Sequence, residues 1–389
     1  MKKVLIFAER MLPSTQTFIP LQVNELQRYN PQYVGLIPAD RNLDLPHPPV
    51  MLTHDRGQFS RVRRELYRWT GVAPSFHACL RNKHAHLIHA HFAEGGSAAL
   101  SLSQYLRLPL VLHLRGGAEL LPDHELRRHL FQLPFLVHRK RLWQRASLFL
   151  CVSNFIREKA LKAGFPAEKV RVQYTGMDLE RFTARDTFDH KDPNMVLYVG
   201  RLVPYKGCDY LLRAMQQVQH RRPDAHLVVI GDGTFRAELE RLARELNVAC
   251  QFVGEKPQKE IRAWYERARV FCGPSVTLED GMSEAFGNVF SEAQAMGVPV
   301  VSFHHGGIPE TMQDGVTGLL APERDVPMLA DHLLRYLQDD AFWATSRQQG
   351  MRWVRETFDV RRQTARLEDL YDRVIAGFQP GGFQQEAPL

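Results

Sequence analysis

The sequence predicts an α/β protein with two doubly wound parallel-sheet domains. At 389 residues the chain is longer than a usual single α/β unit, so two domains are the default expectation. Short apolar runs rich in Val, Leu and Ile alternate with longer segments of helical character, as they do when helices connect buried parallel strands. With 44% hydrophobic residues, the chain can fill two cores.

The first domain is expected to span residues 1–190. Apolar runs predict a helix over residues 17–28 and strands at residues 2–8, 85–92, 108–113, 146–153 and 169–173. In doubly wound sheets the ligand lies at loops that follow the carboxyl ends of strands, so residues 9–17 form a candidate site loop. Within it, Ser14, Thr15 and Thr17 are either substrate contacts or helix caps.

Three histidines, His86, His89 and His91, fall in the second of these strands. Clustered histidines suggest a metal site. Side chains alternate between the two faces of a strand, however, so His86 does not share a face with His89 and His91. A polar strand end that lines a cleft is therefore favoured over a zinc site.

A charged linker at 183–193 is expected to lead into the second domain, which would span residues 191–360. Residues 329–353 are predicted to be helical, and strands are predicted at 195–199, 225–230, 251–253, 270–273 and 298–303. The loop after the first of these strands carries Arg201 and Lys206. Two cations on a short loop after a parallel strand suit a diphosphate, although a solvated loop is the alternative.

The most informative stretch, residues 281–303, predicts a loop, a helix and a buried strand. Glu284 and Glu292 lie eight positions apart. In one helix this spacing would separate them by roughly 12 Å along the axis, so a loop position for Glu284 and a second-turn position for Glu292 fit better. Residues 286–289 place backbone amides at a helix start, which would seat a phosphate. Alternatively, Glu284 interacts with the helix dipole and Glu292 is a solvated surface charge.

The order of motifs in this region is specific. Glu284-Ala-Phe-Gly-Asn-Val289 is followed by Glu292-Ala, Gly297-Val-Pro-Val-Val301, Gly306-Gly-Ile-Pro-Glu310 and Asp314-Gly-Val-Thr-Gly318. This order resembles the donor-site block of retaining glycosyltransferases of family 4. The resemblance implies the GT-B fold, in which two Rossmann-like domains face a cleft and a C-terminal helix, here residues 361–378, crosses back to pack on the first domain. Residues 379–389, rich in Pro, Gly and Gln, are expected to be disordered.

The resemblance also implies roles for individual residues. Family members carry Gly-Arg and then Lys-Gly after the first strand of the second domain, matched here by Gly200-Arg201 and Lys206-Gly207. The implied catalytic residues are Glu284, Arg201, Lys206 and Arg115. The implied donor-binding residues are Gly200, Val253, Gly254, Phe286, Gly287, Asn288, Val289 and Glu292, and the implied acceptor-side residues are Ser14, Thr15, Thr17 and His91.

Three positions in the first domain depart from the family pattern. Arg115 stands where members have a histidine that reaches the donor, Ala118 where they have an aspartate, and Thr175 where they have an asparagine. The Gly-rich turn that usually follows the first strand is also missing. Arg115 keeps a cation at its position, which could neutralise the leaving diphosphate.

The resemblance implies a retaining hexosyltransferase that moves a sugar from a nucleotide-diphosphate sugar, with UDP favoured over GDP, to a glycan or lipid-linked acceptor. Such enzymes build bacterial surface polysaccharides, including lipopolysaccharide and exopolysaccharide. No two aspartates are separated by a single residue, so the metal-binding Asp-x-Asp of other glycosyltransferases is missing and neither a metal nor another cofactor is expected. The alternatives are an epimerase or phosphorylase of the same fold, or a non-catalytic nucleotide-sugar binding protein.

The net charge of +7 and the pI near 9.2 call for an anionic partner. No RNA-binding motif or recognition helix is evident, so nucleic acid is disfavoured. Residues 59–83 and 126–145 pair arginines with Phe, Leu and Trp, and are either solvated faces or a patch for an anionic membrane surface. Residues 4–8 are too short for a signal peptide and no run reaches the length of a membrane span. We therefore expect a cytoplasmic protein, peripheral on the inner face of the cytoplasmic membrane.

Overall fold

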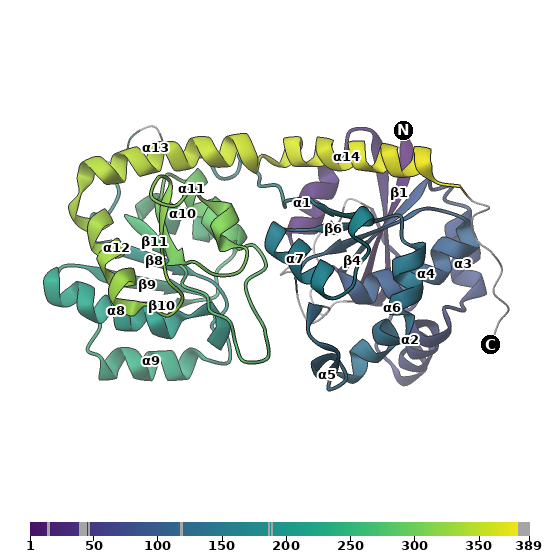
Figure 1. Cartoon of the computed structure of the whole chain (residues 1–389), viewed down its shortest axis with the longest axis horizontal. Coiled ribbons are helices and arrows are strands. Elements are labelled where there is room, and N and C mark those ends of the chain that lie inside the picture. The colour runs from purple at the N-terminus through teal and green to yellow at the C-terminus, as the bar shows by residue number, and fades with distance from the viewer. Residues whose placement is uncertain are drawn as a thin grey trace. The chain divides into compact units, whose positions relative to one another are not determined.

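The computed structural model, described for residues 1–13, 16–38, 45, 47–116, 120–185, 187 and 190–379, divides into two compact units. The first comprises Met1–Gly176 together with the C-terminal stretch that begins at Val360, and the second comprises Met177–Asp359 (Figure 1). The predicted tail from residue 380 onward lies outside the described residues, as do Ser14, Thr15 and Ala118.

The second unit begins earlier than the sequence predicted. The amide of Met177 donates a hydrogen bond to the carbonyl of Phe358 at 2.7 Å. Arg185 forms an ion pair with Glu266 at 2.9 Å. Because the residues after Gly176 make these contacts within the second unit, the boundary expected at residue 190 moves to Gly176.

A seven-stranded parallel sheet forms the centre of the first unit. Its strands are β1 (Lys2–Met11), β2 (Tyr29–Pro38), β3 (Val50–Met51), β4 (Leu87–His91), β5 (Leu110–Leu114), β6 (Leu148–Cys151) and β7 (Val170–Val172). Their spatial order is β3-β2-β1-β4-β5-β6-β7, so the winding reverses between β1 and β4. Doubly wound sheets bind ligands outside the carboxyl ends of their strands at such a reversal.

Helices connect these strands. They are α1 (Phe18–Asn24), α2 (Gln58–Thr70), α3 (Pro74–Arg81), α4 (Phe92–Leu106), α5 (Asp123–Leu126), α6 (Leu133–Arg145), α7 (Asn154–Lys162) and α14 (Val360–Gly377), with 3₁₀ turns at Leu130–Gln132 and Ala167–Lys169. The basic segments predicted at 59–83 and 126–145 thus form α2, α3 and α6.

The C-terminal helix α14 is part of the first unit and packs beside α1 (Figure 1). Its Leu367 and Tyr371 are buried in one core with β1. The carboxylate of Glu368 accepts hydrogen bonds from the amides of Gln27 (2.9 Å) and Arg28 (2.6 Å). Since these two amides bond to α14, α1 stops at Asn24 instead of continuing to Arg28 as predicted.

A six-stranded parallel sheet forms the centre of the second unit, in the order β10-β9-β8-β11-β12-β13. The strands are β8 (Met195–Val199), β9 (His226–Ile230), β10 (Cys250–Gly254), β11 (Val270–Cys272), β12 (Val300–Phe303) and β13 (Gly318–Ala321). The helices are α8 (Cys208–Arg221), α9 (Arg236–Glu245), α10 (Gln258–Arg267), α11 (Asn288–Ala295), α12 (Val326–Gln338) and α13 (Asp340–Thr357), with 3₁₀ turns at Pro204–Lys206 and Ile308–Thr311. The winding reverses between β8 and β11.

The helix predicted at 329–353 is in fact two helices. Asp339 has extended backbone dihedrals, and its side chain accepts the amide of Phe342 at 2.8 Å, which caps the start of α13. Among the helices that the structure describes, none has an apolar stretch of the length that a bilayer crossing requires.

Candidate functional site

The turn between β8 and α8 lies at the reversal point of the second sheet. It ends at Gly207, whose φ is +68°. A Cβ on Gly207 would lie 1.8 Å from the carbonyl oxygen of Pro274, so only glycine allows the segment after β11 to approach so closely. This approach brings Lys206 next to the loop that carries Glu284.

Lys206 and Glu284 form an ion pair between the Nζ and Oε2 atoms, and their side chains are only 18% and 12% exposed. Burial alone would lower the pKa of Lys206, but the neighbouring Glu284 carboxylate outweighs it and raises that pKa. Burial would likewise raise the pKa of Glu284, but the ammonium group lowers it. Both groups are therefore charged at neutral pH, and the cation predicted for a diphosphate is held by a carboxylate.

The backbone of Glu284 is fixed on both sides. Its amide donates to Nε2 of His305 at 3.1 Å, so the ring carries its proton on Nδ1, which lies 3.1 Å from Glu323. The carbonyl of Glu284 accepts from the amide of Gly307 at 3.0 Å. A Cβ on Gly306 would lie 2.3 Å from that same carbonyl oxygen, which explains the glycine pair in the predicted turn.

Arg201 lies beside this pair and is linked to it through Tyr205, which the sequence did not single out. The Nη2 of Arg201 donates to the Tyr205 hydroxyl at 2.7 Å. The Lys206 ammonium lies 5.3 Å from the centroid of the same ring. The sequence could have revealed Tyr205, because it is an aromatic residue that lies between two cations on a short loop.

Helix α11 begins at Asn288, directly after Gly287 in the left-handed region at φ +90°. The amides of Asn288 and Val289 belong to the first turn, where a helix supplies no acceptors of its own. Phe286 is buried, with its ring centroid 5.3 Å from that of Phe358. The loop, the helix start and the second-turn position of Glu292 agree with the predicted arrangement.

Glu292 accepts a hydrogen bond from the Tyr265 hydroxyl at 3.3 Å. Burial of the carboxyl raises its pKa to about 7, although the hydrogen bonds from Tyr265 and Gln258 act in the opposite direction. This carboxyl therefore titrates near neutral pH.

The row of carboxyl strand ends in the second sheet includes Gly200, Val253 and Gly254. The amide of Gly200 bonds to the carbonyl of Ile230, and the amide of Gly231 bonds to that of Gly254, each at 3.0 Å. Val253 and Gly254 end the edge strand β10, two strands from β8. The structure thus gathers Lys206, Arg201 and Glu284 in one cluster, with Gly254 at the far side of the same row of loops.

Arg115 belongs to the first unit, whereas Lys206, Arg201 and Glu284 belong to the second. Its guanidinium is buried, donates to the Thr175 hydroxyl (2.9 Å) and the Gln22 side chain (3.3 Å), and lies 4.9 Å from the centroid of the Phe18 ring. Burial lowers its pKa to about 9. Thr17, another predicted contact, is exposed at the start of α1 and makes no side-chain cap.

His91 is buried at the end of β4, and its surroundings differ from the prediction. The sequence compared His86, His89 and His91 along one strand and missed His113 on β5. His113 lies opposite His91 in the strand register, so His89, His91 and His113 share one face of the sheet. One ring nitrogen from each lies within 4.8 Å of the other two.

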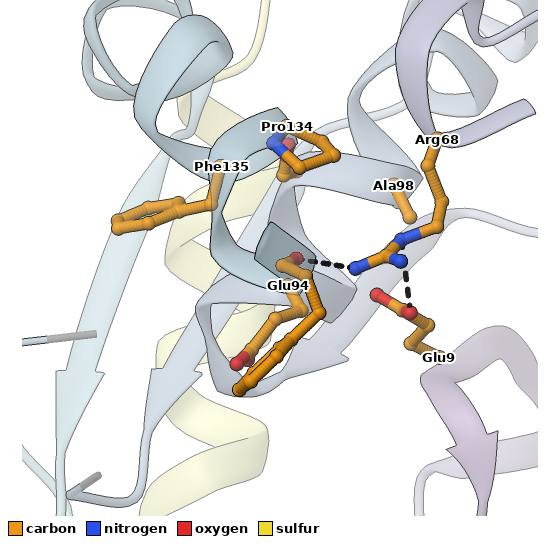
Figure 2. Close-up of a pocket in the computed structure, with 8 residues that line it drawn as sticks. Glu9, Arg68, Glu94, Ala98, Pro134 and Phe135 are labelled. Atoms are coloured by element: carbon orange, nitrogen blue, oxygen red, sulfur yellow. Dashed lines mark hydrogen bonds and ion pairs between the residues drawn. The ribbon is translucent and has the colours of Figure 1, made fainter. Parts of the chain in front are cut away.

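A small cavity lies at the reversal point of the first sheet (Figure 2). Glu9 at the end of β1 and Glu94 in the first turn of α4 line it, and Arg68 reaches it from α2. The Nε of Arg68 lies 3.2 Å from Glu9, and its Nη2 donates to the carbonyl of Phe131 at 2.5 Å (Figure 2). Burial raises the pKa of Glu9 to about 7, although Arg68 opposes the change. The sequence marked residues 9–17 as a site loop but did not pair Glu9 with Arg68.

Two family models match the chain in tandem: Glycosyltransferase Family 4 over residues 24–181 and Glycosyl transferases group 1 over residues 180–352. The chain belongs to glycosyltransferase family 4. This family-4 chain is 33% identical over 257 residues to the amylovoran biosynthesis glycosyltransferase AmsK of Erwinia amylovora, covering 64% of this chain and 61% of the relative. It is 32% identical over 242 residues to a GDP-mannose-dependent phosphatidylinositol monomannoside mannosyltransferase of Mycolicibacterium smegmatis, covering 59% and 63%. The matches span less than two thirds of the length of these relatives.

Solved structures show that the family-4 chain has the GT-B fold. Anabaena Alr3699/HepE in complex with UDP and glucose superposes with a TM-score of 0.73 at 19% identity, covering 96% of this chain and 99% of that one. Sucrose-phosphate synthase of Thermosynechococcus elongatus gives a TM-score of 0.73 at 22% identity, with 97% and 100% covered. At such identities the likeness concerns the fold alone.

Proposed function

We propose that this chain is a retaining glycosyltransferase that moves a sugar from a nucleotide-diphosphate sugar to a glycan or lipid-linked acceptor in bacterial surface polysaccharide biosynthesis. The observation that carries the proposal is the cluster of Lys206, Glu284 and Arg201 at the carboxyl end of β8. Relatives named for amylovoran and colanic acid biosynthesis support the pathway class.

Breaking the bond between sugar and diphosphate leaves negative charge on the diphosphate. We assign Lys206 and Arg201 to that charge, together with the first-turn amides of α11. The Glu284 carboxylate holds the Lys206 ammonium in place before the donor arrives, so little side-chain reorganisation is needed when a diphosphate takes over as its partner. Glu292, one turn into α11, is assigned to the ribose hydroxyls. In this scheme the cations replace a metal ion at the diphosphate.

The donor is proposed to be either a UDP-sugar or a GDP-sugar, and different relatives favour different nucleotides. The family resemblance favours a UDP-sugar, and the HepE complexes contain UDP, although at 19% identity. Relatives at 32% to 36% identity are named as GDP-mannose-dependent, which favours a GDP-sugar. Thermal unfolding of the full-length protein with UDP- and GDP-sugars separates the two, since only the cognate donor stabilises the folded state strongly.

Transfer itself is tested by incubating the protein with the stabilising donor, labelled in its sugar, and a membrane extract as the source of acceptor. Label in a glycan or lipid fraction supports glycosyl transfer. Conversion of the donor sugar without any acceptor would instead establish the epimerase alternative. Binding with neither reaction would favour the non-catalytic alternative.

For the acceptor side we propose the cavity of Glu9 and Arg68. Ser14, Thr15, Thr17 and His91 remain the acceptor-side candidates that the family resemblance implies. The cavity's volume of about 10 Å³ admits a single hydroxyl group or water molecule. A carboxyl group and a guanidinium that share one hydroxyl-sized space suit an alcohol, which both accepts and donates hydrogen bonds.

We also propose that the first unit binds an anionic membrane surface through an exposed apolar face, here called the α2–α6 patch. Helix α2 presents an exposed stripe whose members recur every three or four residues, and residues 131 and 137 add to it. The patch consists of Phe59, Val62, Leu66, Trp69, Phe131 and Val137, of which Phe59 is 95% exposed.

Contacts join the two parts of the α2–α6 patch. His138 lies 3.1 Å from the carbonyl of Trp69, and Arg68 donates to the carbonyl of Phe131. Exposed cations, among them Arg61, Arg63 and Lys140, accompany the patch. Fewer arginines face solvent than the sequence suggested, because Arg64 is buried against the carbonyl of Asp55 at 2.7 Å. Apolar insertion with a few cations gives reversible attachment.

A further inference from the structure

Three buried histidines converge on one face of the first sheet, between β4 and β5. His89 and His91 are two residues apart on β4, and His113 pairs with His91 in the strand register. One nitrogen from each lies within 4.8 Å of the others. The ring centroids are separated by 4.4 Å (His89–His91), 5.5 Å (His89–His113) and 5.8 Å (His91–His113).

These rings leave polar atoms without hydrogen-bond partners of good geometry. This holds for Nε2 of His89 and for both ring nitrogens of His91 and His113. Nδ1 of His89 instead lies 2.5 Å from the Tyr371 hydroxyl of α14. The backbone of Gln173 interacts with His113, whereas both ring nitrogens of His91 and Nε2 of His89 have no such partner. Unpaired buried polar atoms are costly, so their concentration in one cluster indicates that a partner belongs there.

The chemistry of the cluster selects the partner. All three rings are almost fully shielded from solvent, with exposed fractions of 1% for His89, 1% for His91 and 0% for His113. A neutral imidazole has one ring nitrogen with a free lone pair, and such nitrogens are common ligands of borderline transition-metal ions. The hydrogen bond to Tyr371 occupies Nδ1 of His89 and leaves Nε2 as the ligand atom.

We propose that His89, His91 and His113 bind one transition-metal ion of the Zn²⁺ class, with a fourth position for an exogenous ligand. Ligand nitrogens around tetrahedral zinc lie about 3.4 Å apart, so the three atoms must approach by about 1 Å. The rings of His89 and His113 are inclined by only 16°, so coordination also requires them to turn. We expect rotations of the side chains to supply both changes, with the strands in place.

Arg115 shapes the properties of this site. Its buried guanidinium repels a dication, which lowers the affinity and favours an anionic fourth ligand such as hydroxide or chloride. Replacing Arg115 by Gln is therefore expected to tighten zinc binding about tenfold or more. The site is built from residues of the first unit alone, whereas Lys206 and Glu284 belong to the second unit, so the site does not rest on the proposed transfer chemistry.

Equilibrium dialysis of the untagged full-length protein against Zn²⁺, followed by elemental analysis, tests the site. We expect about one ion per chain, lost in His91→Gln and His113→Gln and kept in the control His86→Gln, whose imidazole lies outside the cluster. Tyr371→Phe should weaken binding about tenfold, because it removes a hydrogen bond to a ligand. Far less than one ion per chain, or binding that survives both cluster variants, would overturn the proposal.

A measurement on the wild-type chain covers the case in which the variants fail to fold. X-ray absorption at the zinc edge is expected to show three imidazole ligands. A zinc shell with fewer than three imidazoles would exclude the cluster as the binding site. In a separate measurement, the Arg115→Gln variant should bind zinc more tightly than the wild-type chain does. Neither result depends on glycosyl transfer, so failure of this proposal leaves the proposed function standing.

Discussion

Lys206 and Glu284 place a cation and a carboxylate in contact where the donor diphosphate is proposed to bind. Replacing Lys206 by Ala should lower kcat/KM by about 10² to 10³, or roughly 3 to 4 kcal/mol, because the growing charge on the leaving group loses its nearest cation. Lys259→Ala, on an exposed position of α10, is the matched control. Circular dichroism should accompany the kinetics, since Glu284 is left without its partner. Unchanged turnover of a confirmed donor by folded Lys206→Ala would remove Lys206 from the mechanism.

The second residue-scale prediction concerns pH. Burial raises the pKa of Glu292 to about 7, so its carboxylate forms only as the pH passes that value. Ribose hydroxyls donate more strongly to a carboxylate than to a carboxylic acid, so nucleotide affinity should rise between pH 6 and pH 8. Titration calorimetry with the nucleotide measures this slope, which should disappear in Glu292→Gln. If Glu292→Gln shows a slope of equal size, another titrating group causes the pH dependence of nucleotide affinity.

The same raised pKa has a consequence for stability with the opposite sign. The contribution of Glu292 is fully present below its ordinary value near 4.5 and is lost as the pH rises through about 7. Stability without ligand and affinity for nucleotide therefore respond in opposite directions to pH at this residue.

At the level of single residues, the sequence located many candidates but few of their partners. Glu284 and Lys206 were found through motifs, whereas their ion pair joins positions far apart in the chain. Glu9 with Arg68, and His91 with His113, are likewise brought together only by the order in which helices and strands pack in the fold. Local spacing does not contain that order, so the zinc argument considered a single strand and was incomplete.

Elements were predicted best where the apolar pattern was uninterrupted, as in β8, β9 and β12. Strand β2 went unrecognised because its first half contains Asn30, Pro31 and Gln32. Helix α4 also went unrecognised, because it contains Gly95 and Gly96, which are poor helix formers. A Cβ on Gly96 would lie 2.7 Å from Leu112 of β5, so close packing on the sheet explains that glycine better than helix propensity does.

Helix α2 carries the element-scale prediction. Phe59 and Val62 are 95% and 67% exposed, so replacing both by Ser should leave folding intact. Binding to anionic phosphatidylglycerol vesicles should weaken about tenfold or more, because two apolar side chains no longer enter the bilayer. Co-sedimentation at low and high salt measures it. Val316→Ser, an exposed valine of the second unit, serves as the control.

If the wild-type protein fails to sediment with anionic vesicles even at low salt, the membrane proposal is wrong. The proposed glycosyl transfer would be unaffected, and its acceptor would then be sought in solution. Retained binding in the double variant would point to cations outside α2.

On the scale of the whole molecule, the length predicted two domains, the alternation of apolar runs and helical segments predicted parallel sheets, and the family resemblance implied two doubly wound domains. The boundary between the domains was predicted too late in the chain, because residues 183–193 have the composition of a linker. The second unit in fact begins at Met177. Composition reports solvent exposure, and exposed residues can still make contacts such as the ion pair of Arg185 with Glu266.

Ending the chain at residue 359 should destabilise the first unit selectively. Leu367 and Tyr371 of α14 fill its core, and each buried side chain contributes about 1.5 to 3 kcal/mol. Hydrogen exchange followed by mass spectrometry is expected to show lost protection in β1, β4 and α1 and unchanged protection in β8 and β9. Equal loss in both units would contradict the division described above.

The chemistry of the complete enzyme gives the last prediction. Transfer should continue in excess EDTA, because Lys206 and Arg201 are proposed to act where other enzymes use a metal, and the product should retain the anomeric configuration of the donor. Analysis of the product by NMR decides the stereochemistry. Loss of activity that Mn²⁺ restores, or an inverted product, would disprove this mechanism.

Because α14 completes the first unit, the order in which the chain is made differs from the order in which it can be finished. A ribosome releases the strands of the first unit early, but the helix that covers them emerges only after the entire second unit has been synthesised. The second unit is continuous and can fold as soon as it is released. The apolar face awaiting α14 is therefore exposed during the rest of synthesis, when chaperones would have their best opportunity to bind the nascent chain.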